Sequence, residues 1–174
     1  PESLSSIVNL GQLAIEEDDP EAAKEILGFV LENTKDLELL IQAHSYLLEM
    51  KIEKAQEKDF AAINTELTAL LTEYGISPIS LSLQLIQAHF LAFNLKKPEE
   101  GKAIVKKALA LELNVYEEAE VKMELADILL FEEKFNQALI YYSQIEENLK
   151  NDAVAHEASL KAAKTSYFQG DFVW

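Results

Sequence analysis

Residues 120–152, EVKMELADILLFEEKFNQALIYYSQIEENLKND, contain two helical patterns on either side of a turn at Lys134-Phe135. After this turn, apolar and small residues recur every three or four positions, at Phe135, Ala138, Leu139, Tyr142, Ile145 and Leu149. That spacing is typical of one face of an α-helix and not of a strand. The stretch therefore predicts an αα-hairpin, whose apolar face must be covered by a neighbouring hairpin.

A similar turn recurs along the chain at intervals of 37 to 40 residues. In each copy a polar residue precedes Pro or Phe, at Asp19-Pro20, Asp59-Phe60, Lys97-Pro98, Lys134-Phe135 and Asp171-Phe172. Pro20 and Pro98 suit the first position of a helix, where no N–H donor is needed. Asp19, Asp59 and Asp171 suit the N-cap, where a carboxylate accepts hydrogen bonds from free N–H groups. We therefore expect each turn to separate the two helices of one repeat.

The helical patterns between these turns predict an all-α fold of about nine helices in four and a half repeats. The expected helices span 3–17, 20–34, 36–58, 60–74, 78–95, 98–112, 116–132, 135–149 and 153–169. Gly75 followed by Pro78 should end the fourth helix. The repeats are expected at 3–35, 36–76, 77–114 and 115–151, with a partial repeat at 152–174. Because no linker or change of composition divides them, residues 1–174 are interpreted as one domain.

The composition excludes several classes of protein. Only 5 Gly and 4 Pro are present, and there is no Cys. Disulfide scaffolds, cysteine metal sites and thiol catalysis are therefore excluded, and an all-β fold is disfavoured. No stretch of about 18 apolar residues is present to form a transmembrane helix. No phosphate-binding loop, nucleophile elbow or zinc-binding helix motif is found either.

The net charge of −16 restricts the partners that the chain could bind. All 15 cationic residues are lysines, and arginine is absent. This charge disfavours nucleic acid and anionic membrane surfaces, because nothing would offset the repulsion of their phosphates. A basic or neutral protein partner is compatible with it. The alternative interpretation is that the acidic helix faces only keep the protein in solution.

The repeated segments resemble tetratricopeptide (TPR) repeats. The best copy has Leu125-Ala126 in its first helix, Lys134-Phe135 in its turn, and Ala138 and Tyr142 in its second helix. The small residues expected where two helices approach closely are Gly11, Ala23, Gly101, Ala126, Ala138 and Ala163. The resemblance implies a right-handed superhelical array. Because the family repeat has about 34 residues, the longer spacing here predicts longer helices.

Proteins of the TPR family usually hold a partner segment in a concave groove lined by the first helix of each pair, and they are usually not enzymes. By register, the partner-binding candidates are Asn9, Gln12, Ser45, Phe90, Phe93, Asn94, Asp127, Lys164 and Tyr167, with Leu48, Met123 and Leu130 on the same faces. The alternatives are packing between helices for Phe90 and Phe93, and simple solvation for Asn94, Asp127 and Lys164. The family's clamp for a terminal carboxylate is not matched, since Val8, Gln12, Met123 and Asp127 occupy the equivalent positions.

The resemblance therefore favours a non-enzymatic scaffold for a protein or peptide, with no cofactor and no metal. Each histidine, His44, His89 and His156, lies on a different expected helix, so no helical metal pair forms. The alternative function is a structural or self-assembly segment of a larger multi-repeat protein with no peptide ligand of its own.

The chain is further interpreted as a piece of a longer bacterial array, from the cytoplasm or the periplasm. The turn at Asp171-Phe172 should begin a second helix, so the helix at 153–169 would lack its usual partner. Val154, Ala158, Ala162 and Ala163 should then form an open apolar end that self-associates. The alternative is that Tyr167, Phe168, Phe172 and Trp174 fold back and cover this end.

Overall fold

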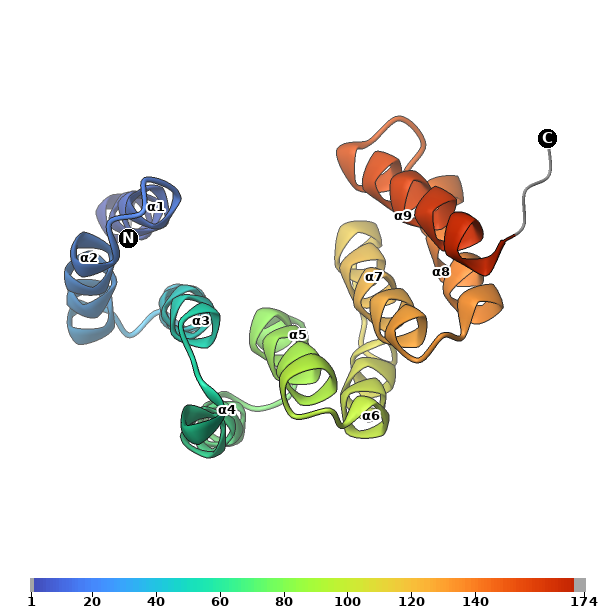
Figure 1. Cartoon of the computed structure of the whole chain (residues 1–174). Coiled ribbons are helices and arrows are strands. Elements are labelled where there is room, and N and C mark those ends of the chain that lie inside the picture. Colours follow the sequence, from blue (N-terminus) through green and yellow to red (C-terminus); the bar gives the residue numbers. More distant parts are fainter. Residues whose placement is uncertain (1, 171–174) are drawn as a thin grey trace. The chain divides into compact units, whose positions relative to one another are not determined.

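A computed structural model describes residues 2–170 of the chain, with side chains from Leu4 onward. The described residues form nine α-helices and no strand, which confirms the predicted all-α class (Figure 1). The helices are α1 (Glu2–Glu16), α2 (Pro20–Asn33), α3 (Leu37–Glu53), α4 (Phe60–Tyr74), α5 (Leu81–His89), α6 (Pro98–Ala108), α7 (Val115–Phe131), α8 (Phe135–Asn148) and α9 (Ala153–Gln169). Two 3₁₀ turns, Glu57–Asp59 and Pro78–Ser80, and a π-helical segment, Phe90–Asn94, complete the described secondary structure.

The chain divides into two compact units, Pro1–Ile86 and Gln87–Trp174, with the border inside α5. In the first unit α1 packs on α2, α2 on α3, and α3 on α4 and on the Pro78–Ser80 turn. In the second unit the π-helical segment packs on α6, α6 on α7, α7 on α8, and α8 on α9. Most of these helices thus pack mainly on their neighbours in sequence. The interpretation of the whole chain as one domain stays a prediction.

Three of the predicted turns share one backbone conformation. In each of them, the residue that precedes the polar residue of the turn adopts a positive φ: Asp18 (56°), Lys96 (57°) and Glu133 (59°). The next N–H then donates back to a helix carbonyl, from Asp19 to Ala14 (2.8 Å), Lys97 to Leu91 (2.8 Å) and Lys134 to Leu129 (2.9 Å). Pro20 and Pro98 each begin a helix, as predicted, and the Asp19 carboxylate caps α2 by accepting from the Ala22 N–H. These bonds are local, which is why the positions of the turns could be predicted from sequence.

The second turn differs from the other three. The helix expected over 36–58 ends at Glu53, and residues 57–59 form a 3₁₀ turn instead. The Asp59 carboxylate accepts from the Gln56 N–H (3.0 Å) and makes no cap to α4. The predicted N-cap role of Asp59 is therefore wrong, because a local bond within the turn uses its side chain. The turn at Asp171-Phe172, with Trp174, lies outside the described residues.

The end of α6 also departs from the prediction. The helix α6 stops at Ala108, four residues early, and α7 begins after Asn114. The Asn114 side chain accepts from the N–H groups of Tyr116 and Glu117, and the Glu117 carboxylate accepts from the Asn114 N–H (2.8 Å). This capping box fixes the start of α7. The predicted end of α4 is correct, since Gly75 lies at its C-cap with φ 76°.

Small residues occur where helices approach closely, with one exception. A methyl group on Gly11 would lie 2.6 Å from Leu27 Cδ2, and one on Gly101 would lie 2.6 Å from the Ala88 carbonyl oxygen. The predicted alanines Ala23, Ala126 and Ala138 are completely buried.

Ala163 is exposed, so the prediction of a close approach there is wrong. The helix α9 packs on α8 and buries Ala155, Ala158 and Thr165, which turns Ala163 toward solvent. The expectation that Ala158 belongs to an open end is wrong for the same reason, because its side chain is already buried within the chain.

Candidate partner-binding groove

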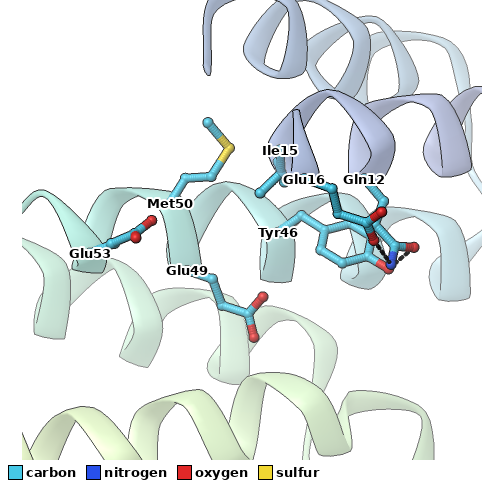
Figure 2. Close-up of a pocket in the computed structure, with 7 residues that line it drawn as sticks. All are labelled: Gln12, Ile15, Glu16, Tyr46, Glu49, Met50 and Glu53. Atoms are coloured by element: carbon cyan, nitrogen blue, oxygen red, sulfur yellow. Dashed lines mark hydrogen bonds between the residues drawn. The ribbon is translucent and has the colours of Figure 1, made fainter. Parts of the chain in front are cut away.

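A cavity of about 390 Å³ lies between α1 and α3, which are the first helices of the first two predicted repeats (Figure 2). Its lining residues are Gln12, Ile15, Glu16, Tyr46, Glu49, Met50 and Glu53. The Tyr46 hydroxyl donates to Gln12 Oε1 (2.9 Å), and Gln12 Nε2 donates to Glu16 Oε1 (3.0 Å). This chain of bonds ties the two helices together along one edge of the cavity, as the dashed lines in Figure 2 show.

A second cavity of about 350 Å³ lies between α3 and the start of α5. It is lined by Glu38, Ile41, Gln42, Ser45, Tyr46, Glu49, Ile79 and Ser82. The hydroxyls of Ser45 and Ser82 are 2.8 Å apart and hydrogen-bonded. Tyr46 and Glu49 line both cavities, so α3 separates one cavity from the other. We refer to the two cavities together as the α3 groove.

The α3 groove is acidic and has an apolar floor. Its lining includes the carboxylates of Glu16, Glu38, Glu49 and Glu53 and no lysine. Among the described residues, no cation lies within ion-pair distance of Glu49. Glu49 is exposed on one side, but the atoms packed around its carboxyl remove part of its hydration and raise its pKa. An unpaired carboxylate with an unfavourable environment would be stabilised by a bound cation.

The predicted candidates of the first unit lie in or near this groove. Gln12 and Ser45 line it, although Ser45 is buried and already bonded to Ser82. Asn9 is exposed on α1 and does not line either cavity. Leu48 is completely buried in the core. The sequence pattern missed Tyr46 and Glu49, the two residues shared by both cavities.

The candidates near the start of the second unit surround an aromatic cluster. Phe90 is completely buried and so offers no surface to a partner. Phe93 is half-buried, and its ring lies 4.3 Å from the His89 ring and 5.1 Å from the Phe131 ring. Asn94 is half-buried at the end of the π-helical segment.

His89 is part of this cluster, and the sequence pattern gave it no role. Its Nδ1 lies 3.2 Å from Glu124 Oε1, which joins α5 to α7. The hydrogen bond to Glu124 raises the pKa of His89 more than burial lowers it. No local signal marks this pair, because its members are 35 residues apart.

Asp127 forms a structural contact in this fold. The Tyr142 hydroxyl donates to Asp127 Oδ1 (2.6 Å), and Lys161 Nζ donates to Asp127 Oδ2 (2.5 Å). Tyr142 is completely buried. Its pKa is raised, mainly by this burial and to a smaller extent by the hydrogen bond to Asp127. The three side chains join α7, α8 and α9. Lys164 and Tyr167 are exposed on α9 and do not contribute to this network.

Over residues 2–170, no group of three His, Asp or Glu side chains is arranged to hold a metal ion. No helix among the same residues combines the length and the apolar character needed to cross a membrane.

Comparisons with known proteins add no assignment: no family model, no curated protein and no solved structure matches the chain.

Proposed function

We propose that the chain is a TPR-like scaffold that holds a segment of a partner protein in the α3 groove and carries out no reaction of its own. The observation that carries this proposal is the pair of cavities side by side along α3, between first helices of successive repeats. The shared conformation of three turns supports a repeated αα-hairpin, which is the unit of the right-handed superhelical array that we propose.

The chemistry of the groove favours binding over catalysis. The residues that line it offer carboxylates, two amides and three hydroxyls, without histidine or lysine among them. The hydroxyls of Tyr46, Ser45 and Ser82 are all occupied in hydrogen bonds between elements. No lining hydroxyl is therefore paired with a general base that would activate it as a nucleophile.

A display library of short random peptides tests this proposal. The peptides that the wild-type chain selects are measured against two variants of matched chemistry. Gln42→Trp places a large side chain in the second cavity from an exposed position. Thr65→Trp makes the same addition at an exposed position of α4 that does not line the groove. We expect Gln42→Trp to weaken binding at least about tenfold, and Thr65→Trp to leave it unchanged. Equal binding by both variants would show that the groove is not the site.

One observation favours the alternative function, a self-assembly segment. The exposed face of α9 carries Leu160, Tyr167 and Phe168, each more than half exposed. Contiguous apolar side chains of this kind mark protein contacts. Light scattering at several concentrations distinguishes the two functions: a concentration-dependent mass that Leu160→Lys with Phe168→Lys abolishes would favour self-assembly.

A further inference from the structure

We infer that the segment bound in the α3 groove carries two cationic side chains, one for each cavity, about three residues apart in an extended polyproline-II conformation. The inference rests on the proposed function and names the chemical class of its partner. It follows from the walls of the two cavities, from the pairing of the neighbouring charges, and from the spacing between first helices.

The first cavity is complementary to both the methylene stem and the charged end of an arginine or lysine side chain. Ile15 and Met50 supply an apolar wall, and Met50 is only 8% exposed. Glu16, Glu49 and Glu53 supply carboxylates around the same space. Long cationic side chains place their methylene stems on apolar surface and keep their charged ends near polar groups. A purely apolar anchor would leave Glu49 and Glu53 without a charged partner and would remove part of their hydration.

The second cavity repeats this combination on the other side of α3. Ile41 and Ile79 form its apolar wall, with Ile79 46% exposed at the rim. Glu38 and Glu49 supply the carboxylates. Because Glu49 lines both cavities, it lies between the two sites where the cationic ends would lie. Its partly desolvated carboxylate would gain a partner from either side.

The chain's own lysines leave the groove unoccupied. Lys51 of α3 is directed away from it and forms an ion pair with Glu66 of α4 (2.5 Å). Lys24 pairs with Glu21 on α2 (2.8 Å). Lys51 thus uses its charge on the α4 side, whereas among the described residues no lysine pairs with the α3 carboxylates that line the groove, Glu38, Glu49 and Glu53. This asymmetry is complementary to a cationic partner.

The distance between the cavities sets the spacing of the anchors. Each cavity lies between two first helices, so the cavities are separated by about one interhelical distance, roughly 8–10 Å. A polyproline-II segment rises about 3.1 Å per residue and has three residues per turn. Residues i and i+3 therefore lie on the same side of such a segment, about 9 Å apart. A fully extended strand would bring i and i+2 to one side about 7 Å apart, and i and i+4 about 13 Å apart, and neither spacing matches the cavities.

Synthetic peptides with fixed anchors test this inference on the whole chain. In the first set, each peptide carries two arginines separated by one, two, three or four residues. The spacing of the anchors therefore runs from i+2 to i+5. Two further sets replace both anchors, first by citrulline, which keeps the shape of arginine without its charge, and then by diaminopropionate, which keeps the charge on a short stem. Calorimetry should show the tightest binding for arginine at i+3, and at least about tenfold weaker binding for both replacements.

Matched charge variants locate the binding. Glu49→Gln with Glu53→Gln removes two carboxylates from the groove, whereas Glu25→Gln with Glu32→Gln removes two exposed carboxylates from α2. Both double variants change the net charge equally. The groove variant should weaken the arginine peptide about tenfold, roughly threefold for each exposed ion pair that it removes, and the α2 variant should not. Equal losses in both would overturn the inference, because they would show attraction by the net charge alone.

Other outcomes separate the inference from the proposed function. If diaminopropionate binds as tightly as arginine, or citrulline does, the cavities do not recognise cationic side chains. Spermine, which carries amines on methylene linkers without a peptide backbone, should compete weakly; binding as tight as that of the peptide would identify a polyamine site instead. If library peptides without any cation bind and Gln42→Trp blocks them, the groove is confirmed while its cationic partner is not. If no peptide is sensitive to Gln42→Trp, the proposed function fails as well.

Discussion

Replacing Gly101 by alanine should destabilise the second unit, although alanine is the better helix former. A methyl group at this position of α6 would lie 2.6 Å from the carbonyl oxygen of Ala88 and 3.2 Å from Ala92 Cβ. Alanine in place of glycine stabilises the interior of a helix by about 1 kcal/mol. Forcing an extra methyl group into a packed contact costs about 1–3 kcal/mol. The two effects leave a net loss of about 0–2 kcal/mol in the free energy of unfolding. Because the obstructing atom belongs to the backbone and cannot rotate away, we expect Gly101→Ala to lie near the upper end of this range.

Two other glycines provide a matched series. A methyl group on Gly28 in α2 meets no heavy atom within 4 Å, so Gly28→Ala should gain about 0.5–1 kcal/mol. A methyl group on Gly11 would lie 2.6 Å from a methyl carbon of Leu27, which is a side chain but is completely buried. The free energy of unfolding of Gly11→Ala should therefore lie between those of the other two variants.

Urea denaturation followed by circular dichroism measures the stability, and hydrogen exchange of the amides in each unit assigns the change to that unit. The midpoint should fall for Gly101→Ala and rise for Gly28→Ala at an unchanged slope. A Gly101→Ala protein as stable as Gly28→Ala would refute the close approach of α6 to α5.

Three further predictions concern polar groups. Tyr142→Phe removes the bond to Asp127 without opening a cavity, and should lower the free energy of unfolding by about 2 kcal/mol in urea denaturation. The pKa of His89 is raised, chiefly by its hydrogen bond with Glu124. The stability that its protonation contributes is therefore present below about pH 6.5 and is lost as pH rises through the raised pKa. Glu124→Gln should lower the pKa of His89 in an NMR titration. Burial raises the pKa of Glu49, so its contribution to stability is present below about pH 4.5 and is lost as pH rises through the raised pKa. Glu49→Gln should therefore raise the thermal midpoint at neutral pH while it weakens binding in the α3 groove, and a lowered midpoint would contradict the desolvation of this carboxyl.

The helix ends were predictable from sequence where local bonds decide them. Pro20, Pro98 and Gly75 act through their own backbone geometry, so their positions predict helix starts and ends without knowledge of the tertiary fold. Asp59 shows the limit of this reasoning. Its carboxylate could cap α4 or bond within the preceding turn, and no pattern distinguishes the two until the backbone is placed.

On α3, the sequence pattern selected candidates one position away from the residues that the two cavities share. The pattern indicated Ser45 and Leu48, whereas Tyr46 and Glu49 line both cavities. The reason is that α3 packs on α1 and α2 as well as on α4 and the Pro78–Ser80 turn, so its apolar residues are not confined to one stripe. A helix with partners on several sides gives a weak periodic signal, and its exposed face cannot be assigned from sequence spacing.

The packing of each helix on its neighbours in sequence has a consequence for biosynthesis. A contact between α1 and α2, or between α7 and α8, joins segments separated by one short turn. Such contacts close small loops, which costs little entropy and allows rapid formation. A hairpin can therefore assemble as soon as it has left the ribosome, before the next hairpin has been translated. Each new hairpin then adds to a surface that is already ordered, so structure is acquired during synthesis in the direction of translation.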